Sequence, residues 1–480
     1  MRGGDGKGLD VGRMSVVVLG MVLWLARPVC ADFEAGRQAY NRGDHVTARR
    51  ELIEDAEGGD SAAQALMGFI YRDGKGVAKD DAEAVKWYRR SAEQGETLGQ
   101  YMLGVVHLFG QGVPRDLAEA ASWFRKAAEQ GNRRAQYAIG LMHYRGDGVS
   151  RELIASYMWL TLAAKYDKDA AELLTKVGAE MTAEQREEAR RLAAAWRPKR
   201  RSDFASTSVT AQPAADSGDY LSRRKSHVTA LQRRGPAPQK WENEPLPRGV
   251  REVFYTSGER RLKAWLALPP RDKEEKVPAV VYFGGGFAMD SSDFKRARFF
   301  LEKGYAVLLP TLRGHNGNPG SFELFFGEVE DGRAAVRWLA GQPGIDAERI
   351  FTFGHSAGGA ISALLSLWDD VPVRLGASSG GLYDDDTFYG WRWNGWVPFN
   401  PNDAVERNLR LLFGNTRFMK RPHIAYVGSE DLSLRVVGED TQAESQRTGG
   451  LLTVVIVPGD HGSSLTPAIS AFLKATQTGR

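Results

Sequence analysis

The sequence predicts a multidomain fold: an all-α solenoid of helical repeats, followed by an α/β domain with a mainly parallel sheet covered by helices. Two observations lead to this prediction. Part of the segment 32–196 repeats with a period of 36 residues, whereas beyond residue 246 short apolar runs alternate with helix-like segments. The length of 480 residues agrees with the division, because single domains seldom grow so large.

The N-terminus is typical of an export signal. Basic residues precede an apolar run at 14–26, and the small-residue sequence VCA at 29–31 resembles a cleavage site. We therefore expect residues 1–31 to be a signal peptide cleaved after Ala31, and the protein to be periplasmic or secreted. Retention of the apolar segment as an anchor is the alternative. Apolar runs beyond it are too short for a membrane span in the mature chain.

Three copies of a 36-residue unit follow. Each unit predicts a helix, a Gly-x-Gly turn with left-handed glycines, and a second helix whose tryptophan faces the stack. The second helices should begin near Asp80, Asp116 and Glu152, where an acidic residue suits the positive end of a helix. Such units bury their apolar faces only against each other, which predicts a superhelical solenoid. The aligned columns are Gly68, Gly104 and Gly140; Gly74, Gly110 and Gly146; Gly76, Gly112 and Gly148; Val77, Val113 and Val149; Trp87, Trp123 and Trp159; and Ala92, Ala128 and Ala164.

The central copy carries the motif G-x-G-V-x-x-D-x-x-x-A-x-x-W-x-x-x-A-A, which resembles the Sel-one-like repeats, a family related to the tetratricopeptide repeats. Residues 33–59 resemble a degenerate first cap and residues 170–196 a closing helix. Asp167 replaces the terminal glycine of the other copies, as expected of an end repeat. The resemblance implies binding of a protein, a peptide or a cell-wall glycan strand; the alternative is a spacer.

Residues 197–245 predict a flexible basic linker. The segment lacks apolar periodicity and is rich in Ser, Ala, Pro and Arg. Residues 197–248 hold eleven Lys or Arg against five Asp or Glu, whereas the whole chain carries a net charge of only +4. The basic excess is therefore local and does not indicate nucleic acid. We interpret the segment as a solvated spacer, with contact to anionic lipid or polymer as the alternative.

The domain at 246–480 predicts a sheet covered on both faces. Residues 251–270 alternate like an antiparallel hairpin, and continuous apolar runs such as PAVVYFGGG, YAVLLPTLRG and RIFTFG follow. Most of these runs are separated by helix-like segments. Short apolar strands that alternate with helices are typical of a mainly parallel sheet.

The motif Gly-x-Ser-x-Gly at 354–358 lies between the apolar run RIFTFG and the helix-like segment AGGAISALL. This position predicts that Ser356 is a nucleophile on a sharp strand-to-helix turn, where glycines are needed because neighbouring elements pass too close for a Cβ. A serine hydroxyl requires a base, which is itself oriented by an acid. His461 follows the last apolar run in a glycine-flanked loop that can reach back to the serine, so we predict it as the base.

The acid should follow the preceding strand, where HIAYVGSED offers Glu430 and Asp431. The Gly-x-x-Asp spacing favours Asp431, and Asp460 is a third candidate. His423 opens an apolar strand, which indicates packing, and His315 precedes the nucleophile, which indicates a structural role in a loop.

Two backbone donors should bind the oxyanion of the tetrahedral intermediate. One is the N–H of Ala357 at the helix start, and the other should come from Gly285 or Gly286 in the loop YFGGGF. A plain tight turn at these glycines is the alternative.

An aromatic insertion at 384–401 follows the run VRLGASSGG at the position of a lid. Its Trp391, Trp393 and Trp396, together with Phe287, are expected to line a pocket for an acyl group, a proline-like ring or a sugar. The alternative is that these aromatic side chains pack only on each other.

The segment 246–480 resembles the α/β-hydrolase fold, and most of all the catalytic domain of the prolyl oligopeptidase family and its dienelactone-hydrolase and esterase relatives. The resemblance implies a Ser-His-Asp triad of Ser356, His461 and Asp431. The chain departs from the family because a solenoid, not a β-propeller, precedes the domain, and because Phe283 stands where many relatives have His or Tyr. The segments that carry the resemblance are LKAWLALPP, FGGGF, RGHNGNPGSF, EDGRAAVRWLAGQPGIDAERIFTFGHSAGG, GSED and GDHG.

These observations predict an exported serine hydrolase that cleaves an ester or peptide bond through an acyl-enzyme, without a metal or organic cofactor. Its substrate is a small ester or a peptide, and its repeats are expected to bind a protein or cell-wall partner. An esterase and a peptidase use the same acyl-enzyme chemistry, so these residues do not distinguish the two activities. The alternative is a catalytically inactive hydrolase-fold binding protein or solenoid scaffold, although no triad member is missing.

Overall fold

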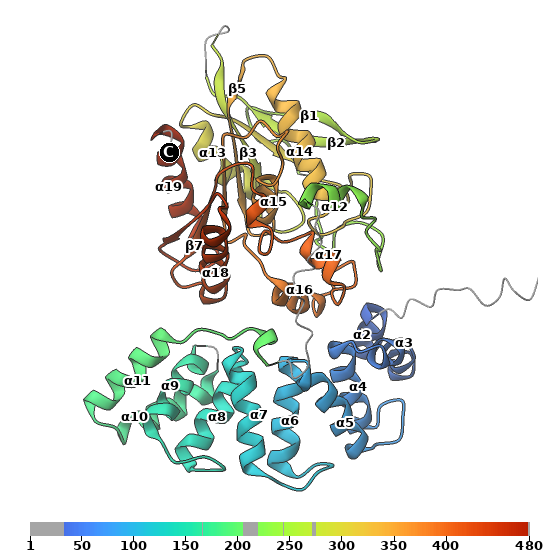
Figure 1. Cartoon of the computed structure of the whole chain (residues 1–480), viewed down its shortest axis with the longest axis vertical. Helices are drawn as coiled ribbons and strands as arrows, with labels where there is room; N and C mark the ends of the chain where they lie inside the picture. The colour runs from blue at the N-terminus through green and yellow to red at the C-terminus, as the bar shows by residue number, and fades with distance from the viewer. Residues whose placement is uncertain (1–32, 166, 205–218, 243, 271–274, 479–480) are drawn as a thin grey trace, which may run out of the picture.

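The computed structural model describes residues 33–165, 167–204, 219–242, 244–270 and 275–478. Figure 1 shows two bodies, a row of stacked helices and a sheet covered by helices. The predicted signal peptide lies outside the described residues. Within those residues, no helix combines the length and the apolar character needed to cross a bilayer.

The N-terminal body is a solenoid in which successive helices stack in sequence order (Figure 1). This architecture confirms the predicted helical repeats. Its helices are α2 (Phe33–Arg42), α3 (His45–Glu57), α4 (Ser61–Asp73), α5 (Asp81–Glu93), α6 (Thr97–Phe109), α7 (Leu117–Glu129), α8 (Arg133–Arg145), α9 (Leu153–Ala164), α10 (Lys168–Ala179) and α11 (Ala183–Ala195).

Glycines set the spacing within each repeat. A Cβ at Gly68 would lie 2.3 Å from the ring of Tyr88, and one at Gly104 would lie 2.6 Å from the ring of Phe124. The two helices of a repeat therefore pack more closely than any other residue would allow. The turn glycines at both Gly-x-Gly positions of every copy have positive φ, between 64° and 77°, as predicted.

The closing segment consists of two helices, so the prediction of one closing helix is wrong. Thr182 accepts a hydrogen bond from the amide of Gln185, whose side chain accepts one from the amide of Thr182. This capping box starts α11 and separates it from α10.

The C-terminal body is built on an eight-stranded sheet with the order β1-β2-β4-β3-β5-β6-β7-β8. The pairs β1/β2 and β2/β4 are antiparallel, and the other neighbours are parallel. This topology confirms the predicted α/β-hydrolase fold. The strands are β1 (Val250–Ser257), β2 (Arg260–Ala267), β3 (Val277–Phe283), β4 (Ala306–Pro310), β5 (Ile345–His355), β6 (Leu375–Ser379), β7 (His423–Gly428) and β8 (Leu452–Val457).

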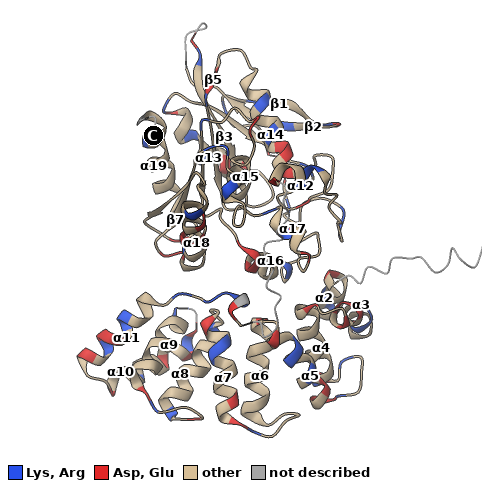
Figure 2. Ribbon diagram, viewed as in Figure 1, with Lys and Arg blue, Asp and Glu red and all other residues tan. Residues whose placement is uncertain are grey.

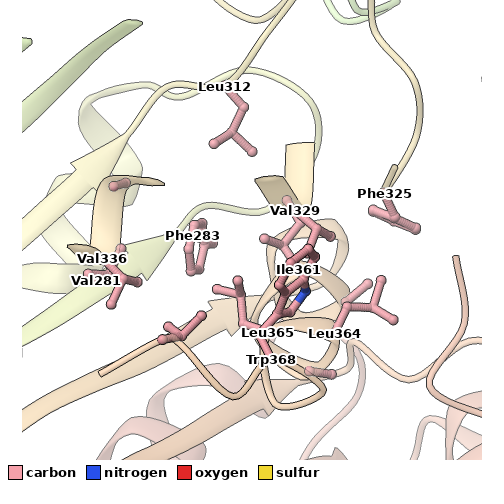
Figure 3. Close-up of a cluster of buried hydrophobic side chains, with 14 of the residues drawn as sticks. Val281, Phe283, Leu312, Phe325, Val329, Val336, Ile361, Leu364, Leu365 and Trp368 are labelled. Atoms are coloured by element: carbon pink, nitrogen blue, oxygen red, sulfur yellow. The ribbon is translucent and has the colours of Figure 1, made fainter. Parts of the chain in front are cut away.

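Helices cover both faces of the sheet. On one face, Phe300 of α13 and Phe472 of α19 pack on Phe353 of β5, with ring centroids 5.6 and 5.4 Å away. The other face carries the larger core, in which side chains of α14 and α15 meet those of β3 (Figure 3). The remaining helices are α12 (Tyr220–Ser226), α13 (Ser291–Leu301), α14 (Gly327–Ala340), α15 (Ala357–Leu365), α16 (Asp385–Arg392), α17 (Ala404–Asn408), α18 (Leu432–Thr448), α19 (Leu465–Thr478) and the short 3₁₀ turns η1 (Arg201–Asp203) and η2 (Thr416–Phe418).

Part of the predicted linker belongs to the hydrolase domain, which corrects the prediction of a flexible tether over its whole length. Tyr220 is fully buried, and its hydroxyl donates to the carbonyl of Leu409 at 2.9 Å. The Arg224 guanidinium donates to the same carbonyl at 2.7 Å. A tyrosine and an arginine thus anchor the segment by hydrogen bonds to a main-chain carbonyl. Such contacts do not produce an apolar periodicity in the sequence.

The two domains are in contact through α16. Arg392, its last residue, forms a buried ion pair with Asp60, the N-cap of α4, and Asn402 donates to the same carboxylate at 2.9 Å. In the first turn of α16, Asp386 accepts from the amide of Arg201 at 2.9 Å. Figure 2 shows charged residues of α16 and of the segment after α11 where the domains meet.

Candidate active site

Ser356 lies on a strained turn between β5 and α15. Its φ and ψ are 49° and −122°, a region that residues with a side chain rarely adopt. A Cβ at Gly354 would lie 2.0 Å from the carbonyl oxygen of Gly358, and a Cβ at Gly358 would lie 2.3 Å from that of Phe283. Both glycines of the Gly-x-Ser-x-Gly motif are therefore required by close contact of backbones.

Three side chains predicted from the sequence lie together at the carboxyl edge of the sheet. Nε2 of His461 is 3.1 Å from Oγ of Ser356, and Nδ1 of His461 is 3.0 Å from Oδ2 of Asp431. They follow β5, β7 and β8, and the parallel strands bring them to one edge. We call them the Ser–His–Asp group. The side chain of His461 is 44% exposed, so the group is open to solvent on that side.

The other two acids considered from the sequence have different surroundings. Glu430 is exposed, and its amide donates to the carbonyl of Gly459. Asp460 accepts hydrogen bonds from Gly462 and Ser463, which close the turn that carries His461. Among the three acids, Asp431 is therefore the one bonded to the imidazole.

The histidines assigned to structural roles are buried. Nε2 of His423 is 3.0 Å from Oγ of Ser378, and burial lowers its pKa to about 3. His315 packs against Phe287, and burial lowers the pKa of His315 to about 4. Both are neutral at pH 7.

On the oxyanion side of the site, one of the three predicted backbone donors is already hydrogen-bonded to a side chain. Ala357 is the first residue of α15, where an amide has no partner within the helix. The Gly285 amide bonds instead to the carboxylate of Asp293, whose pKa is raised to about 6 by burial and by Asp290. Gly286, with φ of 77°, is the remaining predicted donor of this loop.

Tyr383 was not predicted as a site residue, yet its hydroxyl lies 3.3 Å from Oγ of Ser356. Its ring is fixed between Phe325, parallel at 5.9 Å, and Trp391, edge-on at 4.7 Å. Burial raises the pKa of Tyr383, so the phenol keeps its proton. Tyr383 lies four residues beyond the end of β6, at the carboxyl edge of the sheet. This position in the sequence could have indicated that Tyr383 lies near the nucleophile.

His355 is the second residue that sequence reasoning missed, although it precedes the nucleophile. Its ring centroid lies 5.3 Å from that of His461, and Nδ1 is 3.1 Å from the carbonyl of Ser379. Burial, and then the charge of His461, lower the pKa of His355 to about 4. The ring beside the imidazole of His461 is therefore uncharged at pH 7.

Three of the four predicted pocket aromatics form one cluster. Phe287 lies 6.1 Å from Trp391 and 5.9 Å from Trp396, and the two tryptophans are 6.0 Å apart between ring centroids. Trp393 does not join them, because it packs edge-on against Phe33 of the solenoid at 5.6 Å.

The fold and this edge of the sheet define an α/β hydrolase preceded by a helical-repeat solenoid. Comparison with known families agrees: residues 257–420 match the X-Pro dipeptidyl-peptidase (S15 family), and residues 61–96, 97–132 and 133–165 match the Sel1 repeat. These stretches of the chain are therefore similar to a peptidase S15 domain and to three Sel1 repeats.

Curated relatives match parts of the chain. An uncharacterized protein of Mycobacterium tuberculosis is 35% identical over 133 residues, which are 28% of this chain and 46% of that protein. The uncharacterized peptidase YtmA of Bacillus subtilis is 28% identical over 133 residues, which are 28% of this chain and 51% of that protein. Dipeptidyl-peptidase 5 of Porphyromonas gingivalis is 32% identical over 126 residues, 24% of this chain and 18% of that protein. The chain spans about half the length of the first two.

Solved structures also match. The acylaminoacyl peptidase of Pyrococcus horikoshii has a TM-score of 0.40 at 19% identity and covers 48% of this chain and 40% of its own. A puromycin-hydrolyzing peptidase of Mycobacterium tuberculosis has a TM-score of 0.42 at 20% identity, with the same two shares. A Sel1 repeat protein of Oxalobacter formigenes has a TM-score of 0.30 at 27% identity and covers 37% of this chain and 76% of its own.

Proposed function

We propose that the protein is an exported serine hydrolase that cleaves an ester or peptide bond through an acyl-enzyme. The observation that carries this proposal is the position of His461, bonded on one side to Ser356 and on the other to Asp431. The peptidase S15 match supports the same chemistry.

The first step is attack by Ser356 on the carbonyl carbon of the substrate. Nδ1–H of His461 donates to Asp431, which holds the imidazole in the tautomer whose Nε2 accepts the proton of the serine hydroxyl. The resulting imidazolium then gives this proton to the leaving alcohol or amine. An acyl group is left on Oγ of Ser356.

Hydrolysis of the acyl-enzyme repeats these steps with water as the nucleophile and His461 as its base. In both steps the amide of Ala357, together with that of Gly286, donates to the oxyanion of the tetrahedral intermediate. Loss of one such donor typically costs about 10²–10³ in rate.

A fluorophosphonate probe tests the nucleophile. We expect the wild-type chain to be labelled and the variant Ser356→Ala to remain unlabelled. Ser362→Ala, in the helix α15 that follows Ser356, is the matched control and should be labelled. Persistent labelling of Ser356→Ala contradicts the proposal. Comparison of p-nitrophenyl acyl esters with aminoacyl p-nitroanilides then separates an esterase from a peptidase.

Export is proposed from the N-terminal sequence alone. The apolar run and the small-residue site predict that the mature chain begins at Asp32. N-terminal sequencing of the protein from the periplasmic fraction of its host checks this. A cytoplasmic protein with an intact N-terminus contradicts it.

We also propose a protein or cell-wall partner for the repeats, because Sel1-type helices stack into an extended surface. Co-sedimentation of the full-length Ser356→Ala chain with insoluble cell wall, and affinity capture with the same chain, test the two kinds of partner. The proposal fails if neither co-sedimentation nor affinity capture retains a partner whose binding is blocked by an antibody against the solenoid.

A further inference from the structure

Part of the segment between the two domains lies against the loops of the active site. The carbonyl of Gly235 accepts from the amide of Phe322 at 2.8 Å, and the amide of Ala237 donates to the carbonyl of Gly314 at 2.9 Å. Ala237 is also buried in the larger core of the hydrolase domain. We call residues 235–242 the strap. Its course over the domain is fixed, because its main chain is bonded at two points to the segment that follows β4.

Gln239 of the strap contacts the loop that follows β3. Its Oε1 accepts from the amide of Phe287 at 2.6 Å. A Cβ at Gly286 would lie 2.3 Å from the same oxygen, so the carboxamide lies directly against Gly286. The φ of 77° at this position also favours glycine. Gln239 therefore bonds to Phe287 and packs on the residue before it.

The same loop lies beside the nucleophile. A Cβ at Gly358, two residues after Ser356, would lie 2.3 Å from the carbonyl oxygen of Phe283 and 2.4 Å from that of Gly284. The loop therefore begins in contact with the turn that carries Oγ of Ser356. A shift of the residues that follow would change the position of the predicted oxyanion donor at Gly286 relative to this turn.

The amides on both sides of Gly286 are occupied. That of Gly285 bonds to the carboxylate of Asp293, and that of Phe287 bonds to Gln239. Within the described part of the chain, the amide of Gly286 has no acceptor. It is therefore available to an oxyanion, while the two bonds that flank it hold the loop in place.

The orientation of this amide depends on the bond to Gln239. Glycine has more conformational freedom than any other residue, so Gly286 is held by its neighbours and not by its own φ and ψ preferences. A donor stabilises the oxyanion best when it already points to the place where the charge develops. A misplacement of about 1 Å can cost about 10²-fold in rate. Loss of the bond between Phe287 and Gln239 removes the restraint that follows Gly286, whereas Asp293 keeps the one that precedes it.

We propose that Gln239 is a positioning residue of the oxyanion hole, which holds the amide of Gly286 toward the substrate carbonyl through its bond to Phe287. The inference rests on the proposed hydrolase function. It gives the segment between the domains a part in stabilising the transition state.

The substitution Gln239→Met removes the acceptor and keeps the length of the side chain. Gln232→Met is the matched control, because it makes the same change in the same segment and leaves the main-chain bond from Gln232 to the carbonyl of Pro398 intact. Both full-length variants are assayed with p-nitrophenyl acetate for kcat and KM, and their Tm is measured. The inhibition constant of phenylboronic acid is measured as well, because its boron binds Oγ of Ser356 as a tetrahedral anion that resembles the intermediate.

We expect Gln239→Met to lower kcat about 10- to 100-fold, with KM within about threefold of the wild type, because the oxyanion forms only after the substrate has bound. The inhibition constant of phenylboronic acid should rise by a similar factor. Tm should be unchanged, because Gln239 is exposed. Gln232→Met should keep the wild-type values.

A kcat within twofold of the wild type for Gln239→Met overturns this assignment, and so does an equal loss in Gln232→Met. A raised KM with an unchanged kcat also overturns it, because Gln239 would then bind the substrate and not position the loop. In these cases the hydrolase function stands. A wild-type chain that neither cleaves the ester nor reacts with fluorophosphonate refutes the proposed function itself.

Discussion

The substitution Asp431→Asn tests how the imidazole is oriented. One carboxylate oxygen of Asp431 accepts from Nδ1–H of His461, and the other accepts from the amide of Leu434 as the N-cap of α18. An asparagine keeps the second bond with its oxygen, and so turns its NH₂ group toward His461. Nδ1 must then act as an acceptor, the ring proton moves to Nε2, and the base for Ser356 is lost.

The expected loss in kcat is about 10⁴-fold, as for the same change in a serine protease triad. Stability should change by less than about 1 kcal/mol, because asparagine and aspartate cap helices equally well. The measurements are steady-state kinetics with a p-nitrophenyl ester and the thermal midpoint Tm of both chains.

The neighbour Glu430 provides the control, because Glu430→Gln makes the same charge change on an exposed side chain. Its rate should stay within about twofold of the wild type, since surface charges contribute little. A rate within tenfold of wild type for Asp431→Asn, or an equal loss in Glu430→Gln, would refute the reasoning.

Three further predictions concern single side chains. Tyr383→Phe removes the hydroxyl beside the nucleophile and should lower kcat by about tenfold, the equivalent of one hydrogen bond, with an unchanged Tm. Burial depresses the pKa of His423 to about 3 in the folded state from an ordinary value of 6.5. The contribution of the neutral imidazole to stability is therefore present above pH 6.5 and is lost as the pH falls toward 3. Below pH 6.5, His423→Asn should reduce the pH slope of the free energy of unfolding by about 1.4 kcal/mol per pH unit. Asp60→Asn keeps the helix cap but leaves Arg392 buried without its closest anionic partner, so the free energy of unfolding should fall by about 3–5 kcal/mol. The control Asp80→Asn, at an exposed helix cap, should change the free energy of unfolding by less than about 0.5 kcal/mol. An Asp60→Asn chain as stable as wild type in urea would contradict the last of these.

Local sequence patterns were sufficient to predict the parts of the fold that depend on neighbours along the chain. The glycine and tryptophan columns predicted the repeats because the same contacts recur every 36 residues: Gly68 meets Tyr88 within its unit, and Gly112 meets Asp81 of the unit before. The turn at Ser356 was predictable for the same reason, since Gly354 and Gly358 meet each other across it.

Long-range contacts made by polar residues were not predictable. Arg224 anchors the former linker segment by donating to main-chain carbonyls, and this leaves no mark of periodicity. Tyr383 is one aromatic residue among many near the lid, and its closeness to the nucleophile depends on the pairing of β5 with β6. The Gly285 amide was predicted to be an oxyanion donor because no local sequence pattern shows that it bonds to the carboxylate of Asp293.

The two bonds of α16 to the rest of the chain make the lid and the repeats one mechanical unit. Arg392 at its end is paired with Asp60, and Asp386 in its first turn is bonded to the backbone at Arg201. To swing this helix outward, a ligand must supply the free energy of separating a buried ion pair. Bending of the superhelix is transmitted by the same two bonds, so elastic stress in the repeats acts at Asp386, three residues from the phenol of Tyr383 beside the nucleophile.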